Sequence, residues 1–483
     1  MKKSDFLIYG STLIFSYLFY LQGLGLNLAI FSIWLVLASF ICNPEKLKNK
    51  NAWFVSVLTM IAAGSMAYYG NVLSIIACFF CVVLLFGMTL TAKTGVIVGI
   101  LNGLFTLLMG TYNSIFGKVE ERIKAKQTPA YQEVNEQKRS YKWGLIAIPI
   151  GVVILFFTLY RSANPIFKNL TDKIDLSWIS FAWISFTLIG YYLLYGGFQN
   201  QSIAKLTDFE NRENWNIEES KVKQIQWAGK LLAYKDEFFT AKIMFILLNV
   251  LILIVNVGDL QFLTVSREIP EGMTFADFLH QGVGVLIFSV VISIALVLFV
   301  FRGQLNFESN QKSIKIWAYA WLAQNIIMLV SVAGKNAMYI SAYGLTYKRI
   351  GVYVYVLLTA IGLILTINKI AKAQKNYGLV RSTSFAFMTV FILSTPFDWD
   401  NMIIKCNQDM KKEIDIYYLL SLSDRTIPAL WDMKDNIPSL YDRKLFELRL
   451  IHKTKLFLAK ENNKSWKEWS FANARTRTQL INH

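Results

Sequence analysis

The sequence contains few charged residues and little cysteine, histidine or proline. Only 17% of the 483 residues are charged, against about 25% in an ordinary soluble domain, which argues against a soluble globular protein. The 8 Pro and 27 Gly are too few for a fibrous or low-complexity chain. Three of the four Cys, namely Cys42, Cys78 and Cys81, lie in or beside apolar runs, so no disulfide framework is indicated.

Recognisable catalytic motifs are also absent. The sequence has no P-loop, glycine-rich dinucleotide turn, GxSxG elbow or HExxH helix. The three His are too few for a histidine-rich metal cluster. We therefore expect no catalytic residues, no cofactor and no metal, and favour a non-enzymatic protein.

Apolar residues are abundant and grouped. They make up 54% of the chain and fall into about twelve runs, each near the roughly 20 residues that a membrane helix needs. The runs are residues 6–21, 24–42, 52–69, 72–91, 95–115, 143–161, 178–198, 240–260, 282–301, 316–334, 350–368 and 378–396. The fold class expected is all-α: a polytopic integral membrane protein with about 11–12 transmembrane helices and a small C-terminal helical domain.

The net charge of +17 has an explanation in such a chain. Lys and Arg collect in cytoplasmic loops, so the excess marks orientation and we expect no nucleic-acid partner. The predicted division is an N-terminal membrane region (1–116), a cytoplasmic charged loop (117–142), a transmembrane core (143–396) and a C-terminal helical domain (397–483) outside the cytoplasm. That last domain holds 15 Lys and Arg against 12 Asp and Glu, and its apolar spacing predicts three or four short helices.

The charge rule fails before residue 117. Five runs precede it, so a cytoplasmic loop there would place Lys2, Lys3 and the loop with Lys46, Lys48 and Lys50 outside. Losing one span among the third to fifth runs would remove both conflicts. Losing the first run would correct only the N-terminus, and a weak charge rule would also explain the pattern.

Five polar side chains within apolar runs form the first candidate site. Asn249, Asn256 and Asp259 share one helical stripe, while Gln324 and Lys335 belong to a second. Polar groups in hydrocarbon need a partner or water. Interhelical hydrogen bonding explains them most simply; the alternative is an ion or substrate path, with Asp259 and Lys335 as a possible pair.

The second candidate site lies at the expected outer interface. Asp277 and His280 are three residues apart and could form an acid–base pair, although an interfacial turn explains them more simply. Lys348 and Arg349 stand among tyrosines that suggest an aromatic belt. The alternative for these two residues is a binding lip for lipid phosphate.

Three glycines repeat every fourth residue in the fifth run. Gly95, Gly99 and Gly103 would let two helix backbones approach closely. This pattern predicts helix packing and says nothing about chemistry.

Several phrases are similar to a known family. They are NPIF from Asn164, HQGVGVLIF from His280, YGLTYKRIGVY from Tyr343, DWDNMIIKCN from Asp398 and DIYYLLSLSDRTIPAL from Asp415. They resemble an uncharacterised bacterial multi-pass membrane family catalogued as a domain of unknown function, number forty-one seventy-three. The resemblance implies a bacterial cell-membrane location and a multi-helix core, and carries no activity.

From these observations we expect a multi-pass protein of the bacterial cytoplasmic (inner) membrane. The favoured function is a non-enzymatic envelope assembly or signalling component that docks other proteins. The alternative is a transporter or lipid-handling protein with a polar intramembrane site. The expected partners are membrane lipids and other membrane or envelope proteins.

Overall fold

The computed structural model describes four stretches of the chain. They are residues 3–126 apart from 89, 90 and 92; residues 152–172 apart from 154, 155 and 158; residues 180–265 apart from 213–214, 218–225, 228–229 and 232–233; and residues 275–482 apart from 303, 308–310, 409–414 and 438–439. The sixth predicted run, 143–161, lies mostly outside the described residues.

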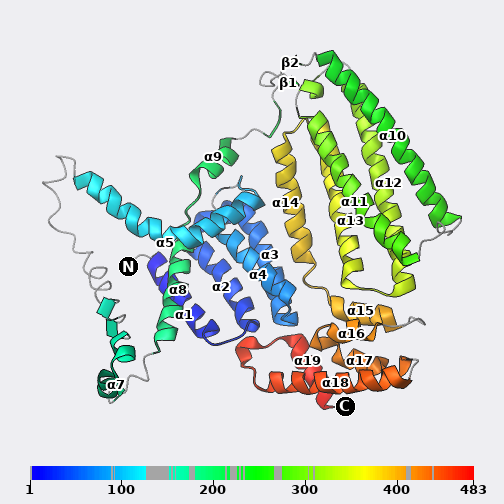
Figure 1. Cartoon of the computed structure of the whole chain (residues 1–483). Helices are drawn as coiled ribbons and strands as arrows, with labels where there is room; N and C mark the ends of the chain where they lie inside the picture. Colours follow the sequence, from blue (N-terminus) through cyan, green and yellow to red (C-terminus); the bar gives the residue numbers. More distant parts are fainter. Residues whose placement is uncertain are drawn as a thin grey trace.

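The described chain is built from helices, and the all-α fold class is confirmed. The N-terminal group comprises α1 (Lys3–Phe19), α2 (Leu26–Cys42), α3 (Lys50–Tyr69), α4 (Val72–Gly87), α5 (Val96–Lys126) and α8 (Phe181–Phe198). The second group comprises α10 (Tyr234–Thr264), α11 (Phe275–Val300), α12 (Gln311–Tyr343) and α13 (Tyr347–Ala371). Figure 1 shows α14 (Asn376–Leu393) between the groups, and the ring of Phe385 in α14 lies 5.2 Å from that of Phe54 in α3, measured between centroids.

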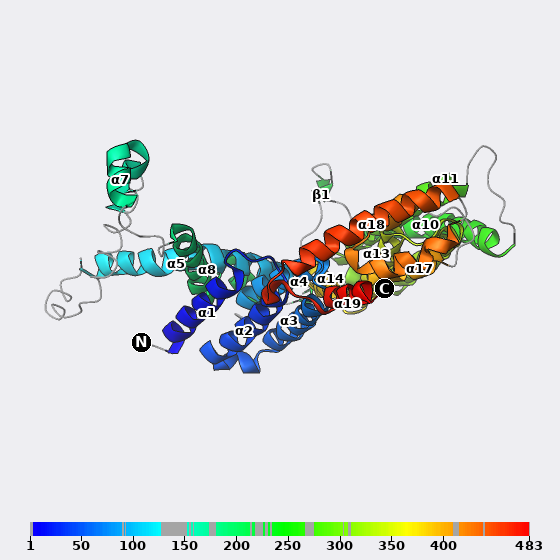
Figure 2. The same cartoon turned by 90° about the horizontal axis from the view of Figure 1, so that it is seen from below.

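The C-terminal residues form a layer under both groups, which we call the tail (Figures 1 and 2). It contains five α-helices among the described residues, more than the three or four that the apolar spacing predicts. They are α15 (Trp399–Gln408), α16 (Ile416–Ser421), α17 (Ile427–Met433), α18 (Leu440–Asn462) and α19 (Phe471–Ile481), with short 3-10 turns η5 (Asp424–Thr426), η6 (Lys434–Asn436) and η7 (Trp466–Glu468).

Smaller elements connect the groups. They are α7 (Pro165–Asp172), α9 (Ala204–Arg212), the 3-10 turns η1 (Pro44–Lys48) and η4 (Gln304–Asn306), and a hairpin of two-residue strands, β1 (Gln226–Trp227) and β2 (Lys230–Leu231). The hairpin is the only named β-structure in the part of the chain that is described.

Eleven of the twelve predicted runs coincide with helices. Within the described residues, α3, α5, α8, α10, α12 and α13 are long and apolar enough to cross a membrane, and α1, α2, α4 and α11 are shorter apolar helices. Such a chain is a multi-pass membrane protein, because helices satisfy every backbone polar group without water.

Local sequence explains where several helices begin and end. Asn49 begins α3 by accepting a hydrogen bond from the backbone N–H of Asn51 at 2.9 Å, and Asn71 begins α4 by accepting one from Ser74 at 2.8 Å. These side chains accept hydrogen bonds from backbone N–H groups in the first turn, which have no acceptor within the helix. Gly70 ends α3 in a left-handed conformation with φ of 58°, which only glycine adopts at little cost.

The fifth helix runs across its neighbours. In both views α5 extends sideways from the end of α4 past the end of α8 (Figures 1 and 2). A Cβ on Gly103 would lie 2.0 Å from Val83 O, in the last turns of α4, and Thr106 donates a hydrogen bond to Gly196 O, near the end of α8. Both helices end on the face that carries η1: after α8, Asn200 Oδ1 accepts from Lys46 Nζ at 3.1 Å, and after α4, Thr94 O accepts from Asn51 Nδ2 at 2.9 Å.

This placement bears on the conflict in the charge pattern, which disappears if α5 does not cross the membrane. If α5 lies along that face, four helices cross before residue 117, and residues 3–5, 43–49 and 117–126 share one side. The turn after α13 joins the same side, since Lys375 N donates to Trp215 O at 2.8 Å beyond α9. We call this side the basic face. Of the explanations that the sequence leaves open, the geometry favours one non-crossing run among the third to fifth.

Candidate functional site

The five candidate intramembrane residues gather between α10 and α12, in an arrangement that we call the polar seam. Asn249 Nδ2 donates to Trp317 O at 2.9 Å, and Gln324 Nε2 donates to Asn249 Oδ1 at 2.7 Å. Asn256 Nδ2 donates to Gln324 O at 3.0 Å. The seam therefore joins the two helices by amide hydrogen bonds, of the kind that polar residues make between membrane helices.

An ion pair stands at one end of the seam. Lys335 Nζ lies 2.6 Å from Asp259 Oδ1, with side chains 8% and 14% exposed. Three buried oxygens along the seam have no hydrogen-bond partner within the described residues, namely Asn256 Oδ1, Asp259 Oδ2 and Gln324 Oε1. The seam thus holds opposite charges together and keeps unused acceptor capacity beside them.

Of the four candidate outer-interface residues, the structure describes the side chains of Lys348 and Arg349. Asp277 and His280 belong to the first turns of α11, and their side chains lie outside the described residues. Arg349 donates to Tyr343 O at 2.7 Å and to Gly344 O, and its guanidinium lies 4.2 Å from the Tyr339 ring centroid. Arg349 thereby pairs carbonyls at the end of α12, while Lys348 is exposed.

The three spaced glycines have different neighbours. A Cβ on Gly99 would lie 2.9 Å from Met88 Cβ and one on Gly103 would meet the backbone of Val83, so both face the end of α4. Gly95 N instead donates to both carboxylate oxygens of buried Glu210 at 3.1 Å. A carboxylate at the start of α5 opposes the positive end of the helix dipole.

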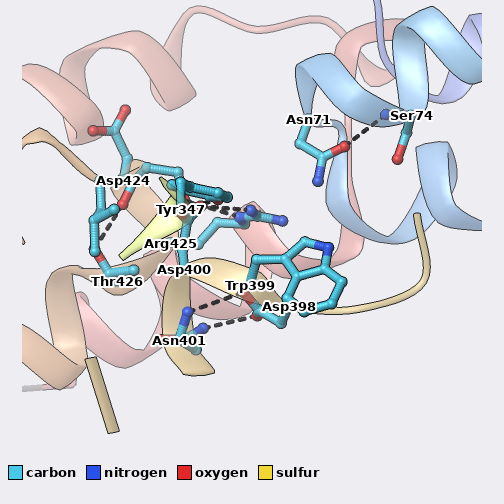
Figure 3. Close-up of polar contacts among 12 residues, drawn as sticks. Asn71, Ser74, Tyr347, Asp398, Trp399, Asp400, Asn401, Asp424, Arg425 and Thr426 are labelled. Carbon is cyan, nitrogen blue, oxygen red and sulfur yellow. Dashed lines mark hydrogen bonds and ion pairs between the residues drawn. The ribbon is translucent and has the colours of Figure 1, made fainter. Parts of the chain in front are cut away.

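A second polar cluster, which the sequence reasoning missed, joins the tail to the membrane helices. Arg425 Nη2 lies 3.0 Å from Asp400 Oδ2, with side chains 5% and 6% exposed. Tyr347, at the start of α13, donates to Asp400 Oδ1 at 2.6 Å. Figure 3 shows these three side chains converging, so the tail is held to α13 by a buried charge that has several partners.

Two neighbours complete this junction. Ser423 donates to Asp400 Oδ2, and Tyr418 OH accepts from Tyr347 N at 2.8 Å. Burial and then the negative charge of Asp400 raise the pKa of Tyr418, while its hydrogen bond from Tyr347 opposes the change. Nearby, Asn407 pairs both backbone groups of Leu345, accepting from N at 2.6 Å and donating to O at 3.0 Å.

A cavity of about 600 Å³ opens beside the junction, between the end of α3 and the tail. We call it the junction cavity. Its lining is mixed in polarity and charge and comprises Tyr68, Tyr69, Asp398, Asn401, Met402, Lys405, Arg425, Pro428, Ala429, Asp432, Ala472, Arg475, Thr476 and Gln479. This volume falls in the usual range of sites for small molecules.

The tail also contacts the N-terminal group. Glu468 accepts from Gly23 N at 2.9 Å, and Leu26 N donates to Trp469 O at 3.0 Å. Tyr69 OH donates to Pro396 O at 3.0 Å. The tail is therefore attached to both helix groups at the face opposite the basic face (Figure 1).

Sequence comparison relates the chain to a known family. Residues 52–433 match the family described as Domain of unknown function (DUF4153). The chain belongs to this family. The resemblance to a family known only as a domain of unknown function is thereby confirmed, and the match gives its number as 4153.

The family match covers the polar seam and the junction, and ends before α18 and α19. No curated protein and no solved structure matches the chain. Among the described residues no group of three or more His, Cys, Asp or Glu side chains could hold a metal ion.

A signal for the junction was present in the sequence. Three of the phrases that carry the family resemblance contain Tyr347, Asp400 and Arg425. In the DUF4153 chain these phrases meet at one point, although 53 residues separate Tyr347 from Asp400. Helical spacing alone could not show this, because it relates positions within one element only.

Proposed function

We propose that this DUF4153 protein is a non-enzymatic envelope assembly or signalling component of the bacterial inner membrane, whose tail docks another protein. The observation that carries the proposal is the exposed surface of α18. Tyr441, Leu448 and Leu456 are 77%, 66% and 59% exposed. Large apolar side chains grouped on an exposed helix are typical of interaction sites.

The charge on this surface is of one sign. The exposed charged residues of α18 are Lys444, Arg449, Lys455 and Lys460, and its acidic residues with described side chains are only partly exposed. Basic and apolar groups on one helix suit an acidic amphipathic segment of a partner protein. In Figure 1, α18 lies on the side of the tail away from the membrane helices, so such a partner would reach it from solution.

Attachment of the tail supports a role in transmission. The junction attaches α15–α17 to α13. Glu468 and Trp469, which precede α19, attach the start of that helix to α1 and α2. A partner that binds α18 would therefore act on a layer connected to both helix groups. A tail attached in this way suits docking better than a tail that moved freely on a hinge.

The test is native-level purification with cross-linking. The wild-type chain should retain a stoichiometric partner, and Leu448→Asp with Leu456→Asp should release it. Leu47→Asp, an equally apolar and exposed position in η1 on the opposite face, is the matched control and should retain the partner. A chain that purifies alone as a monomer or homodimer contradicts the proposal.

A second candidate is a transporter or lipid-handling protein that uses the polar seam. Asn256, Asp259 and Gln324 favour it, since each has an oxygen without a partner among the described residues that could accept a hydrogen bond from a passing solute or water. The test is a cysteine at Asn256 in membranes. Reaction with a small polar maleimide would support a water-filled path, while protection equal to that of a cysteine at buried Val297 contradicts it.

A further inference from the structure

The junction cavity has a placement that suits a ligand near the membrane surface. Tyr68 and Tyr69 are the last residues of α3, one of the helices able to span a membrane. The rest of the lining comes from the tail, from α15, η5, α17 and α19. The cavity is therefore bounded by a helix end on one side and by tail residues on the other.

The charges around the cavity favour an anionic group. Lys405, Arg425 and Arg475 line it, against two acidic residues, Asp398 and Asp432. Asp398 is already used at the start of α15, since it accepts from Asn401 Nδ2 at 2.8 Å and from Asn401 N at 3.3 Å. Arg425 is paired with Asp400, so Lys405 and Arg475 are the cations of the lining that have no ion-pair partner within the described residues.

Arg425 has an unused donor at this site. The residue is 7% exposed, and within the described residues Nη1 has no hydrogen-bond partner, although Nη2 donates to Asp400 and Nε donates to Ser423 at 3.2 Å. One edge of the planar guanidinium is therefore occupied, and the Nη1 side is free to donate. A buried donor without an acceptor is unfavourable, and a ligand oxygen would supply the missing acceptor.

We propose that the junction cavity binds the phosphate group of a small phosphate ester. Arg425 Nη1, Arg475 and Lys405 would donate to phosphate oxygens, a geometry for which guanidinium groups are suited. Gln479 and Asp432 line the same cavity and would accept from hydroxyl or ammonium groups of the ester's alcohol part. The same chemistry occurs in soluble phosphate esters and in phospholipid headgroups.

The experiment uses the full chain, purified in detergent and in nanodiscs. Inorganic phosphate and glycerol 3-phosphate are titrated by calorimetry, and lipid retention from nanodiscs of phosphatidylethanolamine and phosphatidylglycerol is measured by native mass spectrometry. Arg475→Gln and Lys405→Gln should each weaken binding about tenfold, the value expected for loss of one charged hydrogen bond. Arg477→Gln, exposed on α19 but absent from the cavity lining, is the matched control and should bind normally.

The two sources of the ligand give different results. Saturable binding of glycerol 3-phosphate that both lining variants weaken identifies a soluble ester. Retention of phospholipid that both variants abolish, without binding of the soluble probes, identifies a headgroup. Binding of neither kind, or equal effects of Arg477→Gln and Arg475→Gln, overturns the proposal.

Discussion

Lys335 of α12 donates a hydrogen bond of 2.6 Å to Asp259 of α10, across the interface that also holds the amide contacts of the polar seam. The two residues are 76 positions apart in the chain. Their pairing satisfies the rule that charged groups within a membrane region find a partner or water.

Breaking this pair should destabilise the protein. Asp259→Leu removes the carboxylate that pairs with the largely buried ammonium of Lys335, and we expect a loss of about 3–5 kcal/mol in the free energy of unfolding. Replacing both residues, by Asp259→Leu with Lys335→Met, should cost less than the two single changes together. Denaturant titration of all four forms measures the difference, and strictly additive losses would show that the pair contributes nothing.

The Asp400–Arg425 pair should control attachment of the tail. Arg425→Met leaves the Asp400 carboxylate buried with Tyr347 and Ser423 as its remaining described partners, so α15 should loosen and become sensitive to protease. Limited proteolysis of wild type and variant would show this. Glu447→Gln, which breaks the more exposed pair with Lys434, is the control and should change stability by about 0–1 kcal/mol. Equal protease resistance in all three proteins would contradict the role of the buried pair.

Close packing of α4 and α5 should be intolerant of one methyl group. Gly103→Ala would place a Cβ 2.0 Å from Val83 O, closer than atoms can approach, so one helix must move. We expect a loss of about 1–3 kcal/mol. Gly64→Ala, in α3, meets nothing within 4 Å and should be neutral or slightly stabilising. Thermal unfolding of both variants in the same detergent separates the effect of packing from the effect of helix propensity. Equal thermal midpoints for the two variants would contradict a close contact between Gly103 and α4.

Lys46 should make stability depend on pH. Burial lowers the pKa of its ammonium to about 8, from a usual value of 10.5. Between these values the unfolded chain binds more protons than the folded one, so the free energy of unfolding contributed by Lys46 rises with pH from about 8 towards 10.5. Below pH 8 the contribution stays constant. The difference in thermal midpoint between wild type and Lys46→Met should increase over this pH range. The same difference measured for Lys48→Met, at an exposed neighbouring position, should not change with pH.

The tail and the basic face should lie on opposite sides of the membrane. Cys406 is exposed in the tail, whereas Cys78 and Cys81 are buried, so an impermeant maleimide should label Cys406 in intact cells. Lys372→Cys combined with Cys406→Ser should react only after the cells are opened, because positive loops stay in the cytoplasm. Labelling of both positions from outside would reject this orientation.

The helical membrane class and the residues of the polar seam could both be predicted from local features of the sequence. Eleven apolar runs became helices because hydrophobic length and composition are local properties. Asn249, Asn256 and Asp259 shared a face at spacings of seven and three, and a stripe of polar groups in an apolar helix required partners. Gln324 and Lys335 were recognisable for the same reason, although their pairing with α10 was one possibility among several.

The course of α5 and the location of the junction, in contrast, depend on contacts between distant segments and could not be predicted from the sequence. The fifth run is as apolar as a spanning helix, and its direction depends on the contacts of Gly99 and Gly103 with the end of α4. Asp400, Arg425 and Tyr347 meet because three separate elements pack together, and no local periodicity relates them. Hydropathy reflects the free energy of transferring one segment out of water. The course of α5 and the junction instead arise from contacts between segments, and the composition of each segment carries no information about those contacts.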